Sequence, residues 1–253
     1  MGSDQVWRDK YILNNSEYYY LGFVDSRKTR KISYAASFGT DKWLSTELSI
    51  QDAKRLLSDF DHISVREKSG VEICKKTFQM NATVHFDPTL LLNASDYVRL
   101  FNLKTEPSDY LFAYVLDKTN EIEKEIKQMA LKMGLSVKII GAIDENINTL
   151  PPISTWLEYI KNATVVVTDS FHGTVFSILF SKQFWVLGNK DRGLSRFTSL
   201  LGELDLTDRL ITEQDYRLTD LNDHKIDYEK VHHIIDIKRQ EAGEYLNQYV
   251  NKK

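Results

Sequence analysis

The segment VVVTDSFHGTVFSILF, residues 165–180, constrains the fold more than any other part of the sequence. Its first residues belong to a β-branched run at 164–168, which is typical of a central strand buried on both faces of a parallel sheet. A short polar turn follows, and a helix is predicted to begin near Gly173. A buried strand that leads through a short turn into a helix predicts an α/β fold, in which ligands bind outside the carboxyl ends of the strands.

Strand-like and helix-like patterns alternate along the chain, as expected for parallel sheets covered by helices. The predicted strands are residues 18–24, 31–36, 62–65, 83–86, 110–116, 137–140, 164–168 and 184–187. Helices are predicted at residues 45–60, 120–133 and 227–249, and another from Gly173. A further helix carries Val71, Cys74 and Phe78. One more is predicted to start with a capping box of Thr155 and Glu158 and to end at Asn162.

A polar stretch at 104–108 is the best candidate for a linker between domains. We therefore predict an incomplete N-terminal Rossmann-like domain at 1–106 and a second Rossmann-like domain at 107–225. The terminal segment, 226–253, carries an apolar stripe at helical spacing, so it is predicted to pack back on the body.

Composition excludes several classes of protein. The net charge of -3 argues against a nucleic-acid binder, which needs a dense basic face. Cys74 is the single cysteine, which excludes a disulfide within the sequence. A chain without a disulfide favours a cytoplasmic location, and Cys74 itself is expected to lie in the core. No signal peptide is evident, and the richest apolar run, 163–188, is interrupted by Asp169, His172 and Lys182. Any membrane contact is therefore expected to be peripheral.

The turn after the β-branched run carries the first candidate site, Asp169, Ser170, His172 and Gly173. The free N–H groups at a helix start suit an anionic ligand, and a glycine there lets the ligand approach the backbone closely. His172 would face that ligand as a general acid or base. The alternative, that Asp169 and Ser170 only cap the helix while His172 packs between layers, is equally compatible with the spacing.

Arg66 is the second candidate, because it stands where a predicted strand gives way to a helix. A guanidinium at that place can bind a carboxylate or phosphate with two hydrogen bonds. The commoner explanation is a surface arginine paired with Glu67 or a nearby aspartate.

Three loops add weaker candidates, since most such stretches are ordinary turns. GSDQVW contains Asp4, and SYAASFG contains Ser37. The basic stretch NKDRGLSRF offers Lys190, Arg192 and Arg196 for a phosphate, although a solvated basic loop is the commoner interpretation. No glycine-rich phosphate loop and no cluster at metal-ligand spacing is present, so we expect neither a metal nor a cofactor.

The motifs GSDQVW, SYAASFG, SVREKSG, HFDPTLLL and VTDSFHGTVFSILF, in this order, resemble those of the polysaccharide pyruvyl transferase family. The resemblance extends to about residue 209 and implies two Rossmann-like halves in a GT-B-like arrangement with a site between them. It also implies transfer of a pyruvyl group from phosphoenolpyruvate to a hydroxyl of a sugar or lipid-linked saccharide. The products would be capsule, cell-wall or exopolysaccharide precursors.

By this resemblance Arg66 would hold an anionic end of phosphoenolpyruvate, and His172 would act as general acid or base. The helix start at His172 and Gly173, with Arg192, would stabilise the departing phosphate. Asp4 and Ser37 would face the site.

Two departures from the family pattern bear on this prediction. Many members have Ser-x-Arg-x-His where this sequence has Asp-Ser-Phe-His, so Ser170 stands at the position of that arginine. An upstream β-α segment usually precedes the GSDQ motif, so the N-terminal half is expected to be truncated, with an exposed sheet edge that favours a homodimer. Two alternatives stay open: a glycosyltransferase that uses a nucleotide sugar, and a truncated member that binds saccharide without turnover.

Overall fold

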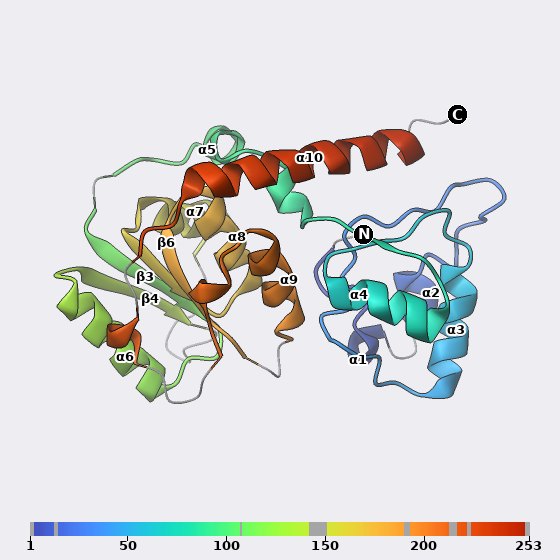
Figure 1. Ribbon diagram of the computed structural model, residues 1–253, viewed down its shortest axis with the longest axis horizontal. Helices are drawn as coiled ribbons and strands as arrows, with labels where there is room; N and C mark the ends of the chain where they lie inside the picture. The colour runs from blue at the N-terminus through green and yellow to red at the C-terminus, as the bar shows by residue number, and fades with distance from the viewer. Residues whose placement is uncertain are drawn as a thin grey trace. The chain divides into compact units, whose positions relative to one another are not determined.

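The computed structural model describes residues 3–12, 15–106, 108–141, 151–189, 193–212, 217–221 and 224–250. The chain divides into two compact units (Figure 1). The first unit consists of Met1–Leu91, Lys190–Leu204 and His232–Lys253, and the second of Leu92–Asn189 and Asp205–Val231. Both units are therefore discontinuous in sequence, whereas the predicted domains were continuous segments with boundaries at 106 and 225.

The second unit is built on a five-stranded parallel sheet in the order β4-β3-β5-β6-β7. Its strands are β3 (Tyr110–Val115), β4 (Ser136–Gly141), β5 (Val165–Thr168), β6 (Gln183–Leu187) and β7 (Leu210–Ile211). All four residues of β5 are buried, as the β-branched run predicts for a central strand. The direction in which successive strands are added reverses between β3 and β5, which makes their carboxyl ends the topological switch point of the sheet.

Helices cover both faces of this sheet; Figure 1 shows α6 on one side and α7 and α8 on the other. The helices of the unit are α5 (Ala94–Phe101), α6 (Asn120–Lys132), α7 (Ile153–Asn162) and α8 (Phe171–Leu179), with short 3₁₀ turns η5 (Thr207–Arg209) and η6 (Leu218–Asp220). Thr119 caps α6 by accepting a hydrogen bond from the Ile122 N–H at 3.2 Å. Ile126, Met129 and Ala130 of α6 then pack on the sheet.

The first unit has a smaller parallel sheet, in which β1 (Ser64–Val65) pairs with β2 (Thr83–Val84). Single parallel bridges, Ile32 to His62 and Ala36 to Val65, add the segment before β1 to it. The helical elements are α1 (Asp9–Ile12), α2 (Ser16–Tyr19), α3 (Glu47–Leu57), α4 (Lys68–Ile73), the π-helical turn η2 (Cys74–Phe78), the 3₁₀ turn η3 (Pro88–Leu91) and α9 (Ser195–Glu203). Trp7 is at the centre of the core, with its ring centroid 5.5 Å from those of Tyr20 and Phe38.

The terminal helix α10 (Tyr228–Val250) contributes residues to both units. In the first unit, the Tyr245 hydroxyl donates to the Ser33 carbonyl at 2.8 Å, and Arg239 Nε donates to the Leu90 carbonyl at 2.7 Å. In the second unit, the Tyr228 hydroxyl donates to the Lys182 carbonyl. The predicted long terminal helix is thus confirmed, and its aromatic residues are its anchors.

Two local predictions are wrong. Residues 18–24 were predicted as a strand, but α2 ends at Tyr19 and Leu21 then takes a φ of 53°, which turns the chain. Thr155 and Glu158 do not form a capping box, because α7 begins earlier, at Ile153. The Glu158 carboxylate instead accepts a hydrogen bond from the Lys104 N–H at 2.8 Å.

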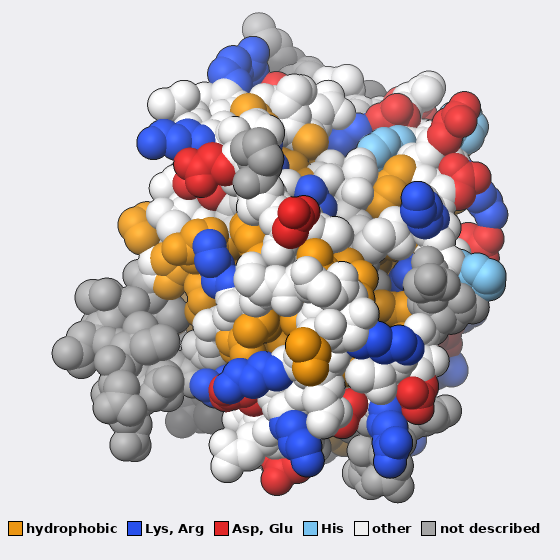
Figure 2. All heavy atoms as spheres, turned by 90° about the vertical axis from the view of Figure 1, so that its left-hand side faces the viewer, with side chains coloured by type: hydrophobic (Ala, Val, Ile, Leu, Met, Phe, Trp, Pro, Cys, Tyr) orange, Lys and Arg blue, Asp and Glu red, His pale blue; other side chains and the backbone are white. Residues whose placement is uncertain are grey.

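The predicted fold class, mixed α/β with parallel sheets and a long terminal helix, is confirmed. Among the residues described, no helix is both long and apolar enough to cross a membrane. On the face shown in Figure 2, lysine and arginine side chains lie among acidic and hydrophobic ones and do not form a single basic patch.

Candidate active site

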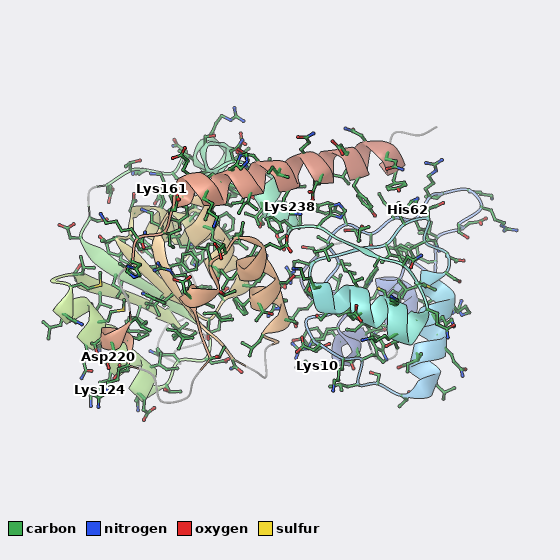
Figure 3. The ribbon with its side chains drawn as sticks, in the orientation of Figure 1. Lys10, His62, Lys124, Lys161, Asp220 and Lys238 are labelled. Carbon is green, nitrogen blue, oxygen red and sulfur yellow. The ribbon has the colours of Figure 1, made fainter. Side chains whose placement is uncertain are left out.

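Residues from four sequence motifs meet in the first unit, in a group of charged side chains that we call the Arg66 cluster: Asp4, Arg66, Glu67, Asp87 and Arg196. Other charged side chains, such as Lys10 in the first unit and Lys124 in the second, are exposed at the surface (Figure 3). The cluster differs from them because four of its five members are almost entirely buried. Buried charges are costly unless they are paired, so their arrangement needs an explanation.

Arg66 follows the carboxyl end of β1 and binds two carboxylates of different exposure. Its Nη1 is 2.6 Å from Asp87 Oδ2, and its Nη2 is 2.8 Å from Asp4 Oδ1. The side chains of Arg66 and Asp87 are 2% and 0% exposed, whereas that of Asp4 is 50% exposed. Burial disfavours the guanidinium, but the negative charges of Asp87, Glu67 and Asp4 outweigh it and raise the Arg66 pKa. Arg66 is therefore a buried, permanently charged group rather than a surface arginine.

Arg196 enters the same cluster from the first turn of α9, where its side chain is 6% exposed. Its Nη1 lies 3.1 Å from Asp4 Oδ1, the oxygen that Arg66 also binds. Gly193, just before α9, lies so close to the SYAASFG segment that a Cβ on it would be 1.9 Å from the Gly39 carbonyl oxygen. Burial, together with the nearby positive charge of Arg66, lowers the pKa of Arg196 to about 10.

Glu67 fixes the loop beside Arg66. Its Oε1 accepts three hydrogen bonds, from Ser37 Oγ at 3.0 Å, from the Phe38 N–H at 2.7 Å and from the Gly39 N–H at 2.9 Å. Burial raises the pKa of Glu67, although the Arg66 charge acts in the opposite direction. The Ser37 hydroxyl is thus used within the protein, and its predicted contact with substrate stays a prediction.

Asp87 belongs to the HFDPTLLL motif and is held in place by its neighbours. Its Oδ1 accepts from both the N–H and the hydroxyl of Thr89, at 3.0 and 2.7 Å, while Ser3 Oγ donates to Oδ2 at 3.2 Å. The carboxylate is thereby fixed for Arg66.

In the second unit, the candidate residues lie at the switch point between β3 and β5. Asp169 Oδ1 accepts from the Leu116 N–H at 2.6 Å, and its Oδ2 accepts from the Asp117 N–H at 2.8 Å, so one side chain joins the ends of the two strands. Ser170 caps α8 by accepting from the Gly173 N–H at 3.3 Å. The capping interpretation is therefore confirmed for Ser170.

Gly173 and His172 occupy the first turn of α8. A Cβ on Gly173 would lie 2.4 Å from Thr168 Oγ1, so the glycine permits close packing of the helix on β5. His172 is partly exposed, and its ring centroid is 5.7 Å from that of Phe171. Its predicted proton transfer stays a prediction.

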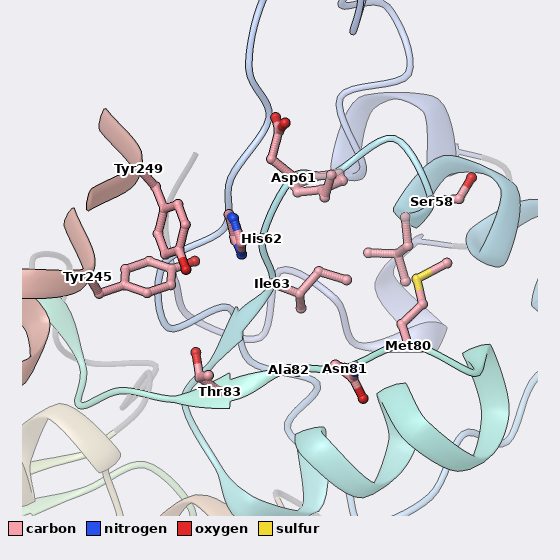
Figure 4. A pocket seen from close by; sticks show the side chains of 12 residues that line it. Ser58, Asp61, His62, Ile63, Met80, Asn81, Ala82, Thr83, Tyr245 and Tyr249 are labelled. Carbon is pink, nitrogen blue, oxygen red and sulfur yellow. The ribbon is translucent and has the colours of Figure 1, made fainter. Parts of the chain in front are cut away.

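A cavity of about 530 Å³ opens at the other ends of the first unit's strands (Figure 4). Figure 4 shows Tyr245 and Tyr249 beside His62, whose ring centroid is 3.4 Å from that of Tyr249. The cavity lies at the amino ends of β1 and β2, whereas open α/β sheets bind ligands at the carboxyl ends. We therefore regard the Arg66 cluster as the better candidate.

The predicted site residues fall into two groups. Asp4, Ser37, Arg66 and Arg196 belong to the first unit, and Asp169, Ser170, His172 and Gly173 belong to the second. Lys190 and Arg192 lie outside the described residues. The described part of the chain contains no group of three or more His, Cys, Asp or Glu side chains that could hold a metal ion.

Sequence reasoning did not assign a site role to Glu67, Asp87 or Asp117. The signal for Glu67 was its place next to Arg66, and for Asp87 its place just after a predicted strand. Asp117 also follows a strand and accepts a hydrogen bond from Asn189 Nδ2 at 2.7 Å.

The comparison with protein families agrees with the order of motifs. The model of the family described as polysaccharide pyruvyl transferase matches residues 2–191, which is most of the chain. This chain belongs to the polysaccharide pyruvyl transferase family. No curated protein matches it significantly.

Two solved structures show a distant likeness. UGT89C1 of Arabidopsis thaliana has 11% identity and a TM-score of 0.49, over 90% of this chain and 65% of that one. The wall teichoic acid polymerase TagF, in a complex with CDPG, has 13% identity and a TM-score of 0.35, over 82% of this chain and 56% of that one. The chain therefore spans less than two thirds of the length of either structure.

Proposed function

We propose that this protein is a pyruvyl transferase that moves the pyruvyl group of phosphoenolpyruvate to hydroxyls of a saccharide acceptor. The observation that carries the proposal is the convergence of two buried guanidinium groups, Arg66 and Arg196, on one oxygen of the half-exposed Asp4 carboxylate. Membership of the polysaccharide pyruvyl transferase family supports the reaction class.

The difference in exposure indicates which of these groups can be exchanged. Arg66 and Arg196 cannot reach water without unpacking, but Asp4 can turn into solvent at little cost because it is already half hydrated. Arg66 keeps Asp87 when Asp4 turns away, so an oxygen of an incoming anion can take the place of the Asp4 oxygen beside the two guanidinium groups. A carboxylate or phosphate of phosphoenolpyruvate presents the same kind of oxygen acceptors as Asp4, and guanidinium groups bind both.

The reaction itself requires movement of protons and loss of phosphate. An acceptor hydroxyl gives up its proton as its oxygen bonds to the central carbon of phosphoenolpyruvate, and a proton is added to the methylene carbon. A second hydroxyl then displaces inorganic phosphate, which takes up the proton of that hydroxyl, and closes the ketal. The role of His172 as general acid or base stays a prediction from the sequence; a group in that role adds roughly 100- to 10,000-fold where it is positioned. The donor, the lipid-linked or free sugar acceptor, the absence of a cofactor and the cytoplasmic location remain predictions from the sequence.

Thermal unfolding with and without phosphoenolpyruvate tests the anion site, because a ligand that binds only the folded protein raises its melting temperature. We expect phosphoenolpyruvate to raise the melting temperature of the wild type and not that of Arg196→Gln. Lys10→Gln, which removes an exposed positive charge in the same unit, is the matched control and should respond like the wild type. A response to UDP or GDP without one to phosphoenolpyruvate would instead support glycosyl transfer.

Turnover is tested by phosphate release from phosphoenolpyruvate in the presence of a saccharide mixture. Release that depends on the saccharide and is lost in His172→Asn supports the assignment. If the folded protein binds none of phosphoenolpyruvate, UDP and GDP, the result would support a member that binds saccharide without turnover.

Asp4→Asn tests the exchange. Because the neutral amide competes more weakly than the carboxylate for the two guanidinium groups, we expect phosphoenolpyruvate to bind this variant more tightly than the wild type. Weaker binding would mean that the Asp4 charge assists the ligand, and the exchange would be wrong.

A further inference from the structure

The two most exposed aromatic side chains of the described residues lie side by side in the first unit. Tyr18 is 69% exposed and Phe23 is 68% exposed, and their ring centroids are 6.4 Å apart. Single exposed apolar side chains are normal on a protein surface, but two neighbouring aromatic rings at this exposure call for an explanation. Both residues lie outside the Arg66 cluster and outside the motifs that carry the family resemblance.

The backbone after α2 brings the two rings together. The Gly22 N–H donates a hydrogen bond to the Glu17 carbonyl at 2.7 Å. This hydrogen bond turns the chain back, so that Phe23 returns to Tyr18. Tyr20, which lies between them in sequence, is fully buried. Because Tyr20 occupies the core side of the turn, the two exposed rings are left on its outer side.

A basic turn follows the two rings, and Figure 1 shows this blue loop projecting from the body of the first unit. Between Tyr18 and Arg30 the sequence has three basic residues and one acidic residue, although the whole chain has a net charge of -3. The side chains of Arg27 and Lys28 are 87% and 82% exposed. Asp25 faces both of them and can neutralise only one, so the segment keeps an excess of positive charge.

Hydrogen bonds to Asp25 hold this turn in one shape. Its carbonyl accepts from the N–H groups of Lys28 and Thr29, both at 3.0 Å. Its Oδ1 accepts from the Arg27 N–H at 3.1 Å and from Arg27 Nε at 3.0 Å. The basic side chains are therefore presented by an ordered turn directly after the exposed rings.

This combination suits the surface of an anionic lipid bilayer. Aromatic side chains favour the headgroup level of a membrane, and basic residues are attracted to anionic lipids. Glu17, the acid next to Tyr18, opposes this attraction little, since Arg55 pairs with it at 2.7 Å.

The size of the exposed pair favours a bilayer over a protein partner. Two aromatic side chains bury at most about 500 Å² together, which is less than the roughly 800 Å² per partner of a standard protein–protein interface. A bilayer needs no matching surface, so a projecting tip of this size is sufficient for a peripheral contact.

We propose that the loop carrying Tyr18, Phe23, Arg27 and Lys28 is the contact of this protein with an anionic lipid bilayer. The two rings enter the headgroup region, and the two cations lie among the lipid phosphates. The contact itself does not depend on pyruvyl transfer, because the loop alone makes it. A saccharide acceptor carried on a lipid would meet the protein at the same membrane surface, a consequence that rests on the proposed function.

Co-sedimentation of the full chain with vesicles tests the proposal, with phosphatidylcholine alone and with added phosphatidylglycerol. We expect binding to the vesicles that contain phosphatidylglycerol, and added salt should weaken it. Phe23→Ser should weaken this binding about tenfold, because the ring no longer leaves water. Leu131→Ser is the matched control and should bind like the wild type, since Leu131 is 80% exposed on α6 in the second unit.

Two double variants test the basic part of the loop. Arg27→Gln/Lys28→Gln should weaken vesicle binding about 25-fold, at roughly fivefold for each basic residue near an anionic surface. Lys75→Gln/Lys76→Gln removes the same charge from another exposed pair of the first unit and should bind nearly as well as the wild type. All four side chains are exposed, so the melting temperature should stay nearly unchanged and weaker binding would not reflect unfolding.

Three results would overturn the proposal. One is equal binding to both kinds of vesicle, or to neither, and another is binding that both loop variants leave unchanged. The third is self-association of the wild type that Phe23→Ser abolishes, without vesicle binding, which would show that a second copy covers the rings. Phe23→Ser should keep the melting response to phosphoenolpyruvate, so failure of this surface and failure of the anion site can be told apart.

Discussion

Both units have charged motif residues just after the carboxyl end of a parallel strand, but these residues have different kinds of partner in the two units. In the first unit, Arg66 pairs with other side chains, one buried and one half-exposed. In the second unit, Asp169 accepts its hydrogen bonds from backbone N–H groups of the neighbouring strand end. An arginine held by side chains can therefore exchange a partner, whereas a carboxylate held by the backbone is part of the scaffold.

The largest expected effect is that of Asp87→Ala. The change leaves Arg66 buried without its 0% exposed partner, and breaking a buried pair costs about 3–5 kcal/mol. Asp4→Ala removes the half-exposed partner of the same guanidinium, and water can take its place, so its cost should be clearly smaller. Urea unfolding measures both free energies. Equal losses would contradict the distinction between a fixed and an exchangeable partner.

Gly173→Ala should be next in size. The added Cβ would meet Thr168 Oγ1 at 2.4 Å, and such overpacking costs about 1–3 kcal/mol. The double variant Gly173→Ala/Thr168→Ala should lose less stability than the two single changes together.

Gly243→Ala is the matched control for this prediction, because the added Cβ would meet nothing within 4 Å in the helix α10. Alanine there should stabilise the protein by about 0.5–1 kcal/mol. A similar loss at both glycines would show that close packing on β5 is not the reason for Gly173.

A pair of amide substitutions tests the comparison most directly. Asp169→Asn should cost about 1–3 kcal/mol, because both carboxylate oxygens accept from N–H groups and an amide can offer only one oxygen. Glu67→Gln should cost less than about 1 kcal/mol, because the hydrogen bonds from Ser37, Phe38 and Gly39 all end on one oxygen. Chemical denaturation measures both, and the reverse order would refute the assignment.

Glu67→Gln should also change how the stability of the protein depends on pH. Because the Glu67 pKa is raised above its usual 4.5, the folded protein binds more protons than the unfolded chain as pH rises above 4.5. This group therefore contributes stability at low pH that is lost as pH rises through its folded pKa. Denaturation at a series of pH values should show that contribution in the wild type and not in Glu67→Gln.

The smallest effect concerns Cys74, the single cysteine, which reports on the first unit alone. Burial, aided by the negative charge of Glu67, raises its pKa from 9.0 to about 12. The thiol should react slowly with iodoacetamide at pH 8 until the first unit opens. Because the folded state holds the proton more strongly, stability should fall as pH rises from 9 to 12. Rapid labelling of the folded protein would contradict the buried position.

The sequence predicted those parts of the fold whose signal is local. The β-branched run became the buried strand β5, and the periodic segment at 120–133 became α6. The tyrosine-rich run at 18–24 failed because β-propensity describes a half-buried pleated surface, whereas Tyr20 packs against Trp7 in a helical turn and its side chain is fully buried.

The site was predictable as a set of residues but not as a set of contacts. Arg66, Asp4 and Arg196 were each candidates, yet Asp4 and Arg196 are far apart in sequence and only folding brings them to one oxygen. Arg196 was expected in a solvated loop because its neighbours are basic, but α9 buries it. The pairing of Arg66 with Asp87 depends on β1 and β2 lying side by side, which no local pattern encodes.

The discontinuity of the first unit has a consequence for its synthesis. Every strand of the second unit precedes residue 212, so that sheet can form while the ribosome is still adding the terminal helix. The first unit begins at an earlier position in the sequence, but it is complete only after Arg196 and then Tyr245 have been added. Tyr245 then donates its hydrogen bond to the Ser33 carbonyl. Of the two units, the one whose residues come earlier in the chain is therefore completed later, and its unfinished surface is the one that nascent-chain chaperones would meet.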